Sequence, residues 1–380
     1  MATTDRDILG RDHMNDLEAI LAITNTDVDE LVHTVKDNAD AIFTWDYEKG
    51  ARPALNKLYV KAKHAQWNGE TDLPWDTIVD PDAALEPFLA AGDPRFGVGG
   101  DLAMLPGSPV KSWGEAEWRN MAMESVNWRL SQFMHGEQGA LICTAKIVET
   151  VPWIDAKYYA STQVMDEARH VEVFAKYLDQ KLTGWYPINR HLELLLDDII
   201  EDSRWDITYL GMQIMVEGLA LAAFGVMHQV TEEPLLKQLL RYVMSDEARH
   251  VAFGVLSLKE LYAELSDAEL RERQEFAFEA AVRMRDRFLM QEVWERQGVD
   301  VKPIVKGLLE TTPKDNPFQQ LLFSKIVPNC KKLGLLDASG GWLRHRFEEI
   351  GVIQFEDWQD TGEEYDAFAL GDDELEGQRA

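Results

Sequence analysis

One hexapeptide occurs twice in this chain, and its repetition limits the folds that the chain can adopt. Asp-Glu-Ala-Arg-His-Val stands at residues 166–171 and again at residues 246–251, 80 residues later. Each copy is preceded by another glutamate, Glu137 or Glu217, which lies 30 residues before the glutamate of the hexapeptide. The chain therefore contains the pattern Glu, thirty residues, Glu-x-x-His twice.

The spacing predicts two antiparallel helical hairpins. The two glutamates of the first copy are equidistant from Pro152, and those of the second are equidistant from Glu232, two residues before Pro234. If the chain turns there, both glutamates of a hairpin lie at one level, roughly 22 Å from the turn at about 1.5 Å per residue. Within each Glu-x-x-His the two side chains are neighbours on one helix face. Four carboxylates and two imidazoles can therefore converge.

Four buried carboxylates need compensating charge, because each ionised group loses its hydration. Two divalent ions would balance four glutamates. Carboxylates with one imidazole per ion suit Fe(II) or Mn(II), and the two cysteines, Cys143 and Cys330, form no CxxC motif. The pattern predicts two Fe ions, with a mixed Mn/Fe pair as the alternative. The predicted metal ligands, which are also the predicted catalytic residues, are Glu137, Glu167, His170, Glu217, Glu247 and His250.

Four charged residues are expected to support these ligands from outside. Asp166 and Asp246 each stand four residues before a motif histidine, so each can approach an imidazole and accept its N–H. We expect them to pair with Arg169 and Arg249. A single copy of the motif would fit a solvent-facing helix turn with local ion pairs about equally well. The two matched copies favour the buried site.

Residues one turn from the ligands are expected to form an apolar pocket wall. Gly136, Gly139 and Gly218 stand beside ligands, where a helix favours alanine by about 1 kcal/mol. They either permit close helix packing or leave room for dioxygen and substrate. The predicted pocket residues are Phe133, Gly136, Ala140, Leu141, Phe174, Ile214 and Leu221.

Apolar residues recur at helical spacing over four unusually long stretches, which predicts an all-α chain with a four-helix bundle. These stretches are residues 113–150, 153–182, 203–230 and 233–265. Two or three helical patterns precede them in residues 14–66, and further helices are predicted at 267–297 and 318–336. The predicted domains are an N-terminal helical extension (1–112), the bundle (113–265), C-terminal helices packing on the bundle (266–355) and a disordered acidic tail (356–380).

The composition, 46% hydrophobic and 28% charged, is that of a globular protein. No run approaches the roughly eighteen apolar residues of a membrane span, and the N-terminus does not resemble a signal peptide. We therefore expect a cytoplasmic protein that does not associate with membranes. A net charge of −29 would repel phosphate backbones, so nucleic acid is not an expected partner. A homodimer is compatible with the sequence.

The duplicated pattern resembles the ferritin-like non-haem diiron carboxylate superfamily over residues 113–265. It is similar to bacterial diiron hydroxylases, ribonucleotide reductase small subunits, acyl-carrier desaturases and p-aminobenzoate N-oxygenase. The segment from Gln66 to Trp75 also looks like one that precedes the bundle in N-oxygenase relatives. The resemblance implies a ferritin-like fold and O₂ chemistry at two metals.

The chain departs from each of these families at one position. Phe174 stands where radical-bearing reductase subunits usually carry Tyr, and Val243 stands where N-oxygenases have an additional His ligand. Leu221 replaces a Thr that is common in bacterial hydroxylases. Desaturases dock acidic carrier proteins, for which a chain of charge −29 is ill suited. The motif therefore specifies the site far better than it specifies the substrate.

The favoured interpretation is a diiron oxidase or monooxygenase that activates O₂ to oxidise an apolar or arylamine small molecule. Its expected partners are that substrate and a separate reductase or ferredoxin, since the chain has no motif for an electron-donating centre of its own. One alternative is a ferroxidase or iron-handling protein. Another is a radical or ligand-binding subunit of a larger complex.

Overall fold

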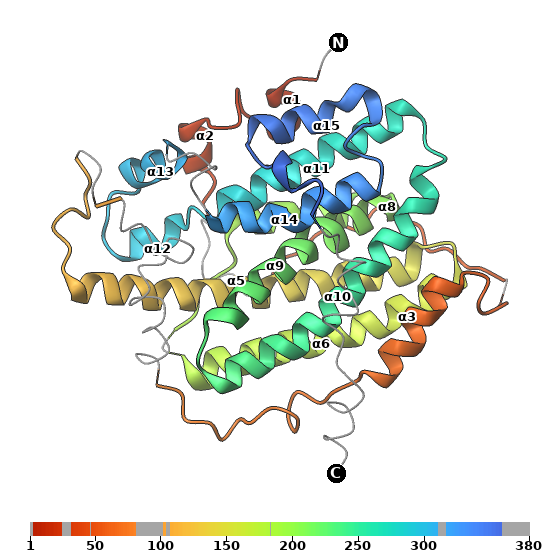
Figure 1. Cartoon of the computed structure of the whole chain (residues 1–380), viewed down its shortest axis with the longest axis horizontal. Helices are drawn as coiled ribbons and strands as arrows, with labels where there is room; N and C mark the ends of the chain where they lie inside the picture. Colours follow the sequence, from red (N-terminus) through yellow and green to blue (C-terminus); the bar gives the residue numbers. More distant parts are fainter. Residues whose placement is uncertain are drawn as a thin grey trace.

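The computed structural model describes residues 3–24, 32–45, 47–80, 102–103, 107–182, 184–310 and 317–358. Within these ranges the regular structure is helical throughout and contains no strand. Figure 1 shows long helices at the centre, with shorter helices from both ends of the chain packed around them. The predicted all-α class is confirmed.

Four long helices form the central bundle, as predicted. The third is not uniform, because a π-helical segment interrupts it between α8 and α9. The bundle consists of α5 (Glu115–Thr150), α6 (Ile154–Lys181), the third helix made of α8 (Trp205–Tyr209), η2 (Leu210–Val216) and α9 (Glu217–Val230), and α10 (Pro234–Tyr262). In space, α5 packs on α6 and α9 packs on α10.

The two hairpins turn where the sequence places proline. Helix α5 ends at Thr150, because Val151 precedes Pro152 and a residue before proline disfavours the helical conformation. Helix α10 begins with Pro234 at its first position, and the Glu233 side chain accepts hydrogen bonds from the first free backbone N–H groups. These turns bring the glutamates of each hairpin to one level.

The third helix corrects one sequence prediction. The segment Trp205–Val230 is long and apolar enough, by length and composition, to cross a membrane. Within the fold, 89% of its most apolar window is buried. A helix that is apolar on all sides fits a core position surrounded by other helices. The π-helical segment Leu210–Val216 ends directly at Glu217, and such segments are frequent at functional sites.

The N-terminal helices are α1 (Asp5–Leu9), α2 (Leu17–Ala22) and α3 (Pro53–His64). Helix α3 packs on α6 and α10 at the edge of the bundle (Figure 1). One large cluster of buried apolar side chains joins the bundle to helices from both ends of the chain and includes Leu58, Phe174 and Phe347. The terminal helices therefore share the core of the bundle.

The predicted helix at 267–297 was wrong in one respect, because the structure divides it into two. The chain breaks at Met290, whose φ of 51° lies in the left-handed region that ends helices. The break lets Leu289 pack against Ile20 and Val305. The remaining helices are α7 (Arg190–Glu201), α11 (Asp267–Arg287), α12 (Gln291–Arg296), α13 (Val301–Glu310), α14 (Pro317–Lys332), α15 (Ala338–Glu349) and the 3₁₀ turn η4 (Ile353–Phe355).

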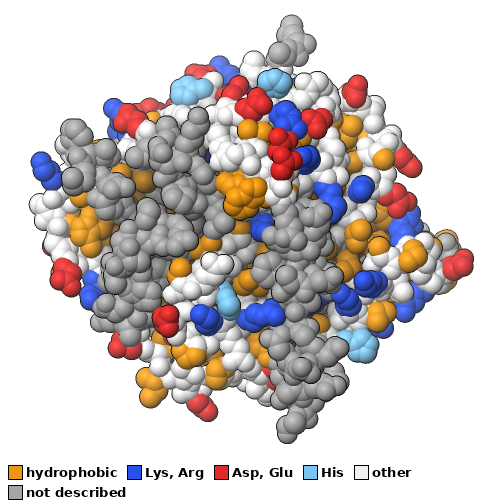
Figure 2. Space-filling view, in the orientation of Figure 1, with side chains coloured by type: hydrophobic (Ala, Val, Ile, Leu, Met, Phe, Trp, Pro, Cys, Tyr) orange, Lys and Arg blue, Asp and Glu red, His pale blue; other side chains and the backbone are white. Residues whose placement is uncertain are grey.

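Acidic and basic side chains are interspersed on the face shown in Figure 2. On this face the described residues form no single acidic patch. Most of the predicted acidic tail, residues 359–380, lies outside the described residues.

Candidate metal centre

The six predicted ligands converge in the middle of the bundle. They form two groups, in each of which the ligand atoms lie within 4.8 Å of one another. The first group is Glu137, Glu167, His170 and Glu247, and the second is Glu167, Glu217 and His250. We call these the His170 position and the His250 position. Since Glu167 belongs to both, the two positions adjoin and share a carboxylate.

The spacing of the ligand atoms fits metal coordination. His170 Nδ1 lies 3.4 Å from Glu167 Oε2 and 3.1 Å from Glu247 Oε1. It also lies 3.3 Å from Glu137 Oε2. His250 Nδ1 lies 3.0 Å from the other oxygen of Glu167. Neighbouring ligands of an octahedral ion with bonds of about 2.1 Å lie about 3 Å apart.

Several buried polar atoms at the site lack a hydrogen-bond partner among the described residues. They are Glu167 Oε2, Glu217 Oε2, His250 Nδ1 and both carboxylate oxygens of Glu247. Unsatisfied buried groups of this kind are rare in folded proteins, because leaving one unpaired costs free energy. Two divalent cations would satisfy them and balance the four glutamate charges. The residues present therefore fit a pair of metal ions.

Without metal, burial and the close charges of the site shift the pKa values of its own ligands. Burial, and next the charge of Glu247, raise the pKa of Glu137 well above its usual value. Burial and the charge of Glu167 do the same to the pKa of Glu217. Burial alone would lower the pKa of His170, but Glu137 and the other surrounding carboxylates raise it well above the usual value. Divalent ions would displace the protons held in this way.

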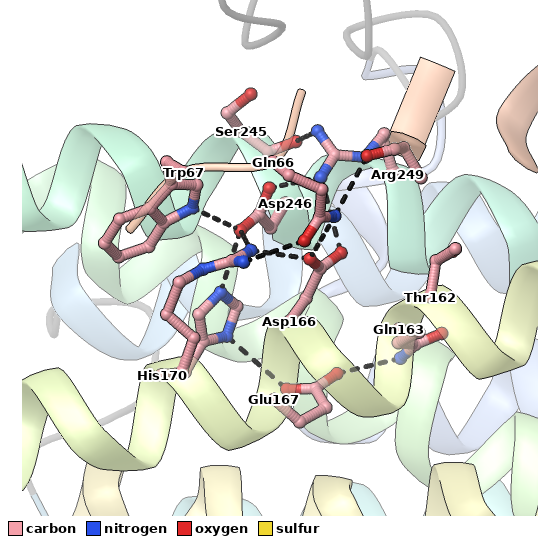
Figure 3. A network of polar contacts seen from close by, with 12 residues as sticks. Gln66, Trp67, Thr162, Gln163, Asp166, Glu167, His170, Ser245, Asp246 and Arg249 are labelled. Carbon is pink, nitrogen blue, oxygen red and sulfur yellow. Dashed lines mark hydrogen bonds and ion pairs between the residues drawn. The ribbon is translucent and has the colours of Figure 1, made fainter. Parts of the chain in front are cut away.

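Asp166 and Asp246 each lie beside the imidazole of the opposite motif. His170 Nε2 is 3.2 Å from Asp246 Oδ2 (Figure 3). His250 Nε2 is 3.3 Å from Asp166 Oδ2. Because both Nδ1 atoms face the glutamates, an N–H donated from Nε2 would fix the tautomer in which Nδ1 can bind metal. The aspartates thus approach the ligand histidines as expected, but the contacts cross between α6 and α10.

The two motif arginines join the aspartates into one network. Arg169 Nη2 donates to Asp166 Oδ1 at 2.5 Å and to Asp246 Oδ2 at 2.9 Å. Arg249 Nη2 donates to Asp246 and to Asp166 Oδ2, the latter at 3.4 Å. Burial would raise the pKa of Asp246, but Arg249 and the other donors hold it well below its usual value. Two aspartates and two arginines cancel, so the network adds no net charge beside the metals.

The segment after α3 completes this network, which the helical patterns did not reveal. Trp67 Nε1 donates to Asp246 Oδ2 at 2.8 Å, and Gln66 Nε2 donates to Asp166 Oδ1 at 3.0 Å. The Trp67 ring also stacks on Tyr242, with ring centroids 4.8 Å apart. These residues lie at least 100 positions from their partners, where helical spacing predicts nothing. The resemblance of 66–75 to a segment of N-oxygenase relatives was the available signal.

Gln163 is a further residue at the centre that sequence reasoning missed. Its Nε2 donates to Glu167 Oε1 and to Glu217 Oε1, both at 2.9 Å (Figure 3 shows the first bond). The side chain is fully buried. The sequence contained a signal for this contact, because Gln163 stands one helical turn before Glu167 and therefore lies on the same helix face.

A small cavity of about 20 Å³ opens beside the glutamates, and this is enough for about one water molecule. Of the predicted pocket residues, Phe133, Gly136 and Ala140 line it. Leu141, Phe174, Ile214 and Leu221 do not. The π-helical segment changes the register before Glu217, so Val216 rather than Ile214 faces the cavity. The remaining lining residues are Gln132, Glu137, Glu217, Leu219, Ala220, Phe224, Glu247, Met284 and Arg287.

The structure separates the two roles proposed for the glycines. A Cβ at Gly136 would meet nothing within 4 Å, so this glycine leaves open space at the cavity. A Cβ at Gly139 would lie 2.6 Å from Leu196 Cδ1, so that glycine permits close packing on α7. A Cβ at Gly218 would make ordinary contact, at 3.8 Å, with Asn329.

No protein-family model matches the chain, and no curated protein matches it. Two solved structures of R2-like ligand-binding oxidase variants are similar to it. One, with an anaerobically reconstituted Mn/Fe cofactor, is 17% identical, with 75% of this chain and 94% of that chain covered and a TM-score of 0.42. The other, with an aerobically reconstituted Mn/Fe cofactor, is 17% identical, with 81% and 94% covered and a TM-score of 0.40. The assignment of the metal centre rests on the chain's own geometry.

Proposed function

We propose that this chain is a non-haem diiron oxidase or monooxygenase that uses O₂ to oxidise an apolar or arylamine small molecule. Two Fe ions would occupy the His170 and His250 positions, with a mixed Mn/Fe pair as the alternative. When bound, such ions supply the electrons that reduce O₂. The reductase or ferredoxin partner and the cytoplasmic location expected from the sequence belong to this proposal.

One observation favours an enzyme: a partly apolar cavity reaches the ligands themselves. Glu137, Glu217 and Glu247 all line it, together with Phe133 and Phe224. An organic molecule in this cavity would touch the metal ligands directly. A site used only to oxidise iron has no need of an apolar wall at the glutamates.

The chain's own residues have distinct tasks in this reaction. Glu167 presents one oxygen to the imidazole of each position and would thus help to hold both ions. Asp166 and Asp246 keep the imidazole N–H on Nε2, which leaves Nδ1 free for metal. The phenyl ring of Phe224 packs edge-to-face on Phe133 at 4.7 Å and helps to exclude water from the cavity. Exclusion of water protects a reactive centre from side reactions.

The test is whether turnover needs an external electron donor. Inserting one oxygen atom from O₂ into a substrate consumes two further electrons, and the sequence has no motif for a donor within the chain. With excess O₂ and a panel of arylamines and apolar compounds, we expect at most about one product per reduced site without reductant. NAD(P)H with a reductase, or a chemical reductant, should restore catalysis. Sustained turnover without any reductant would contradict the need for a reductase partner and would point instead to a substrate that supplies all four electrons.

The same experiment addresses iron handling. A ferroxidase would consume O₂ in proportion to added Fe(II), would need no organic substrate, and would give a large cage on gel filtration if it stores iron. That result would replace the proposed enzyme with the ferroxidase alternative.

A further inference from the structure

We infer that Arg287 binds a carboxylate group of the substrate, so that the molecule oxidised at this site is an organic anion with an apolar body. The inference rests on the proposed function and adds the substrate's chemical class. It arises from a buried arginine whose charge has no ionic partner among the residues that the structure describes.

Arg287 is the last residue of α11, and its side chain is only 4% exposed. Its one hydrogen bond among the described residues runs from Nη1 to the thioether sulfur of Met284, at 3.7 Å, and its Nε has no partner. Burial lowers the pKa of Arg287 to about 10, so the guanidinium remains charged at neutral pH. A thioether is a weak acceptor for a buried cation.

Several other buried arginines in this fold have carboxylate partners. Arg249, Arg273 and Arg285 each donate to an aspartate. The acidic residue that raises the pKa of Arg287 is Glu292, but its carboxylate accepts hydrogen bonds from Trp128 and Asn189 instead. Within the described part of the chain, Arg287 thus has a buried charge without an ion pair, and a bound anion would supply one.

The position of Arg287 determines how this anion would be oriented in the cavity. Arg287 lines the same cavity as Glu137 and Glu217, with Phe133 and Phe224 among the residues that line it as well. A carboxylate on the guanidinium would therefore leave the apolar part of the molecule beside the metal ligands. Two divalent ions neutralise the four glutamates, so the metal centre itself would not repel the anion.

The cavity must widen to admit such a molecule, since its volume is about 20 Å³. Met284, which lines the cavity and contacts Arg287, has an unbranched side chain that rearranges readily. A carboxylate makes stronger, charge-assisted hydrogen bonds with a guanidinium than a thioether does. Displacement of Met284 by the carboxylate would both open the cavity and pair the charge.

A purely structural role is the competing explanation. The Arg287 guanidinium lies 4.8 Å from the centroid of Phe288, which could hold it in place without any ligand. The two explanations differ in whether removing the charge changes the binding of anions while leaving neutral molecules unaffected.

The probe is benzoate, compared with its uncharged isostere benzamide. Calorimetry would measure the affinity of both compounds for the metal-free and the Fe(II)-loaded protein. A salt concentration of about 0.15 M screens surface charges. We expect benzoate to bind, and Arg287→Met to weaken it by about tenfold to a hundredfold, as for loss of a charged hydrogen bond. Benzamide binding should stay within about threefold. Arg129→Met is the matched control, a buried arginine that does not line the cavity and should leave benzoate affinity unchanged.

A second variant keeps the test decisive if Arg287→Met does not fold. Met284→Glu places a carboxylate next to Arg287, so it should keep the guanidinium paired and abolish benzoate binding. Benzoate that binds both variants as tightly as the original chain would overturn the inference, as would equal affinity of the original chain for benzoate and benzamide. Metal content, measured in parallel, separates this inference from the proposed diiron function. If the chain binds two Fe ions but Arg287→Met leaves benzoate affinity unchanged, only the carboxylate site at Arg287 is refuted.

Discussion

The hairpin of α5 and α6 and the hairpin of the third helix and α10 carry the same motif, but they differ one turn before the motif glutamate. The first has Gln163 at that place and the second has Val243. Gln163 donates to Glu167 and Glu217, whereas a valine has no donor. The His170 group contains three carboxylates and the His250 group contains two, although Glu247 Oε1 also lies 3.6 Å from His250 Nδ1.

The two hairpins also differ in their backbone. Helix α5 is α-helical from end to end through Glu137, whereas the π-helical segment Leu210–Val216 immediately precedes Glu217. Duplicated ligands therefore do not imply equivalent metal positions. We expect the His170 position, where three carboxylates lie close to one another, to bind the first ion, and the His250 position to bind the second ion more weakly.

Removal of the shared carboxylate should have the largest effect. Glu167→Ala takes a ligand from both positions and should abolish dinuclear binding. Glu247→Ala should do the same, because Glu247 Oε1 lies 3.1 Å from His170 Nδ1 and 3.6 Å from His250 Nδ1. Glu217→Ala touches only the His250 position and should leave about one Fe(II) per chain. Anaerobic Fe(II) titration measures these stoichiometries, and two ions bound by Glu167→Ala would contradict the shared position.

His135 offers a matched control two residues from Glu137. It is largely buried, and its Nε2 contacts the backbone oxygen of Tyr186 at 2.9 Å rather than the metal centre. His135→Ala should keep both ions. If His135 proved essential and His170 dispensable, the assignment of helix faces would be wrong.

The crossed contacts between aspartates and histidines predict an intermediate effect. Asp246→Asn should weaken the ion at His170, and Asp166→Asn should weaken the ion at His250, each by about tenfold to a hundredfold with the fold retained. Stepwise binding constants from calorimetry would show which ion is affected. If each substitution instead weakened the ion at the histidine of its own motif, the crossed contacts would not determine metal affinity. If neither binding constant changed, the aspartates would serve only as ion-pair partners of the arginines.

Gln163→Val should have the smallest effect, because it makes the two hairpins alike at this place. Loss of the two bonds to Glu167 and Glu217, at about 0.5 kcal/mol each, should weaken the second ion by roughly fivefold. The first ion should change less. Two binding steps that both remain unchanged would mean that the difference between the positions arises elsewhere, with the π-helical segment as the next candidate.

The sequence allowed the bundle and the ligand residues to be predicted because both follow from local periodicity. The spacing around Pro152 and Pro234 placed the hairpin turns, and the helix faces placed Glu167 beside His170. Contacts between distant segments could not be predicted in this way. Trp67 reaches Asp246 from 179 residues away, and nothing in the helical pattern indicates that bond.

Two other features depended on tertiary packing. The break at Met290 overrides a continuous helical pattern, because it buries Leu289 against residues from both ends of the chain. Arg287 lies outside the repeated motif, so its place beside the ligands emerges only when α11 packs on the bundle.

The most direct test is anomalous diffraction at the iron edge from crystals of the Fe(II)-loaded chain. Our account predicts two peaks about 3.5–4 Å apart, with Glu167 between them. One peak should lie at His170 Nδ1 and the other at His250 Nδ1. A single peak, or iron bound instead at another cluster such as His33, Glu193 and Asp197, would contradict the paired metal centre.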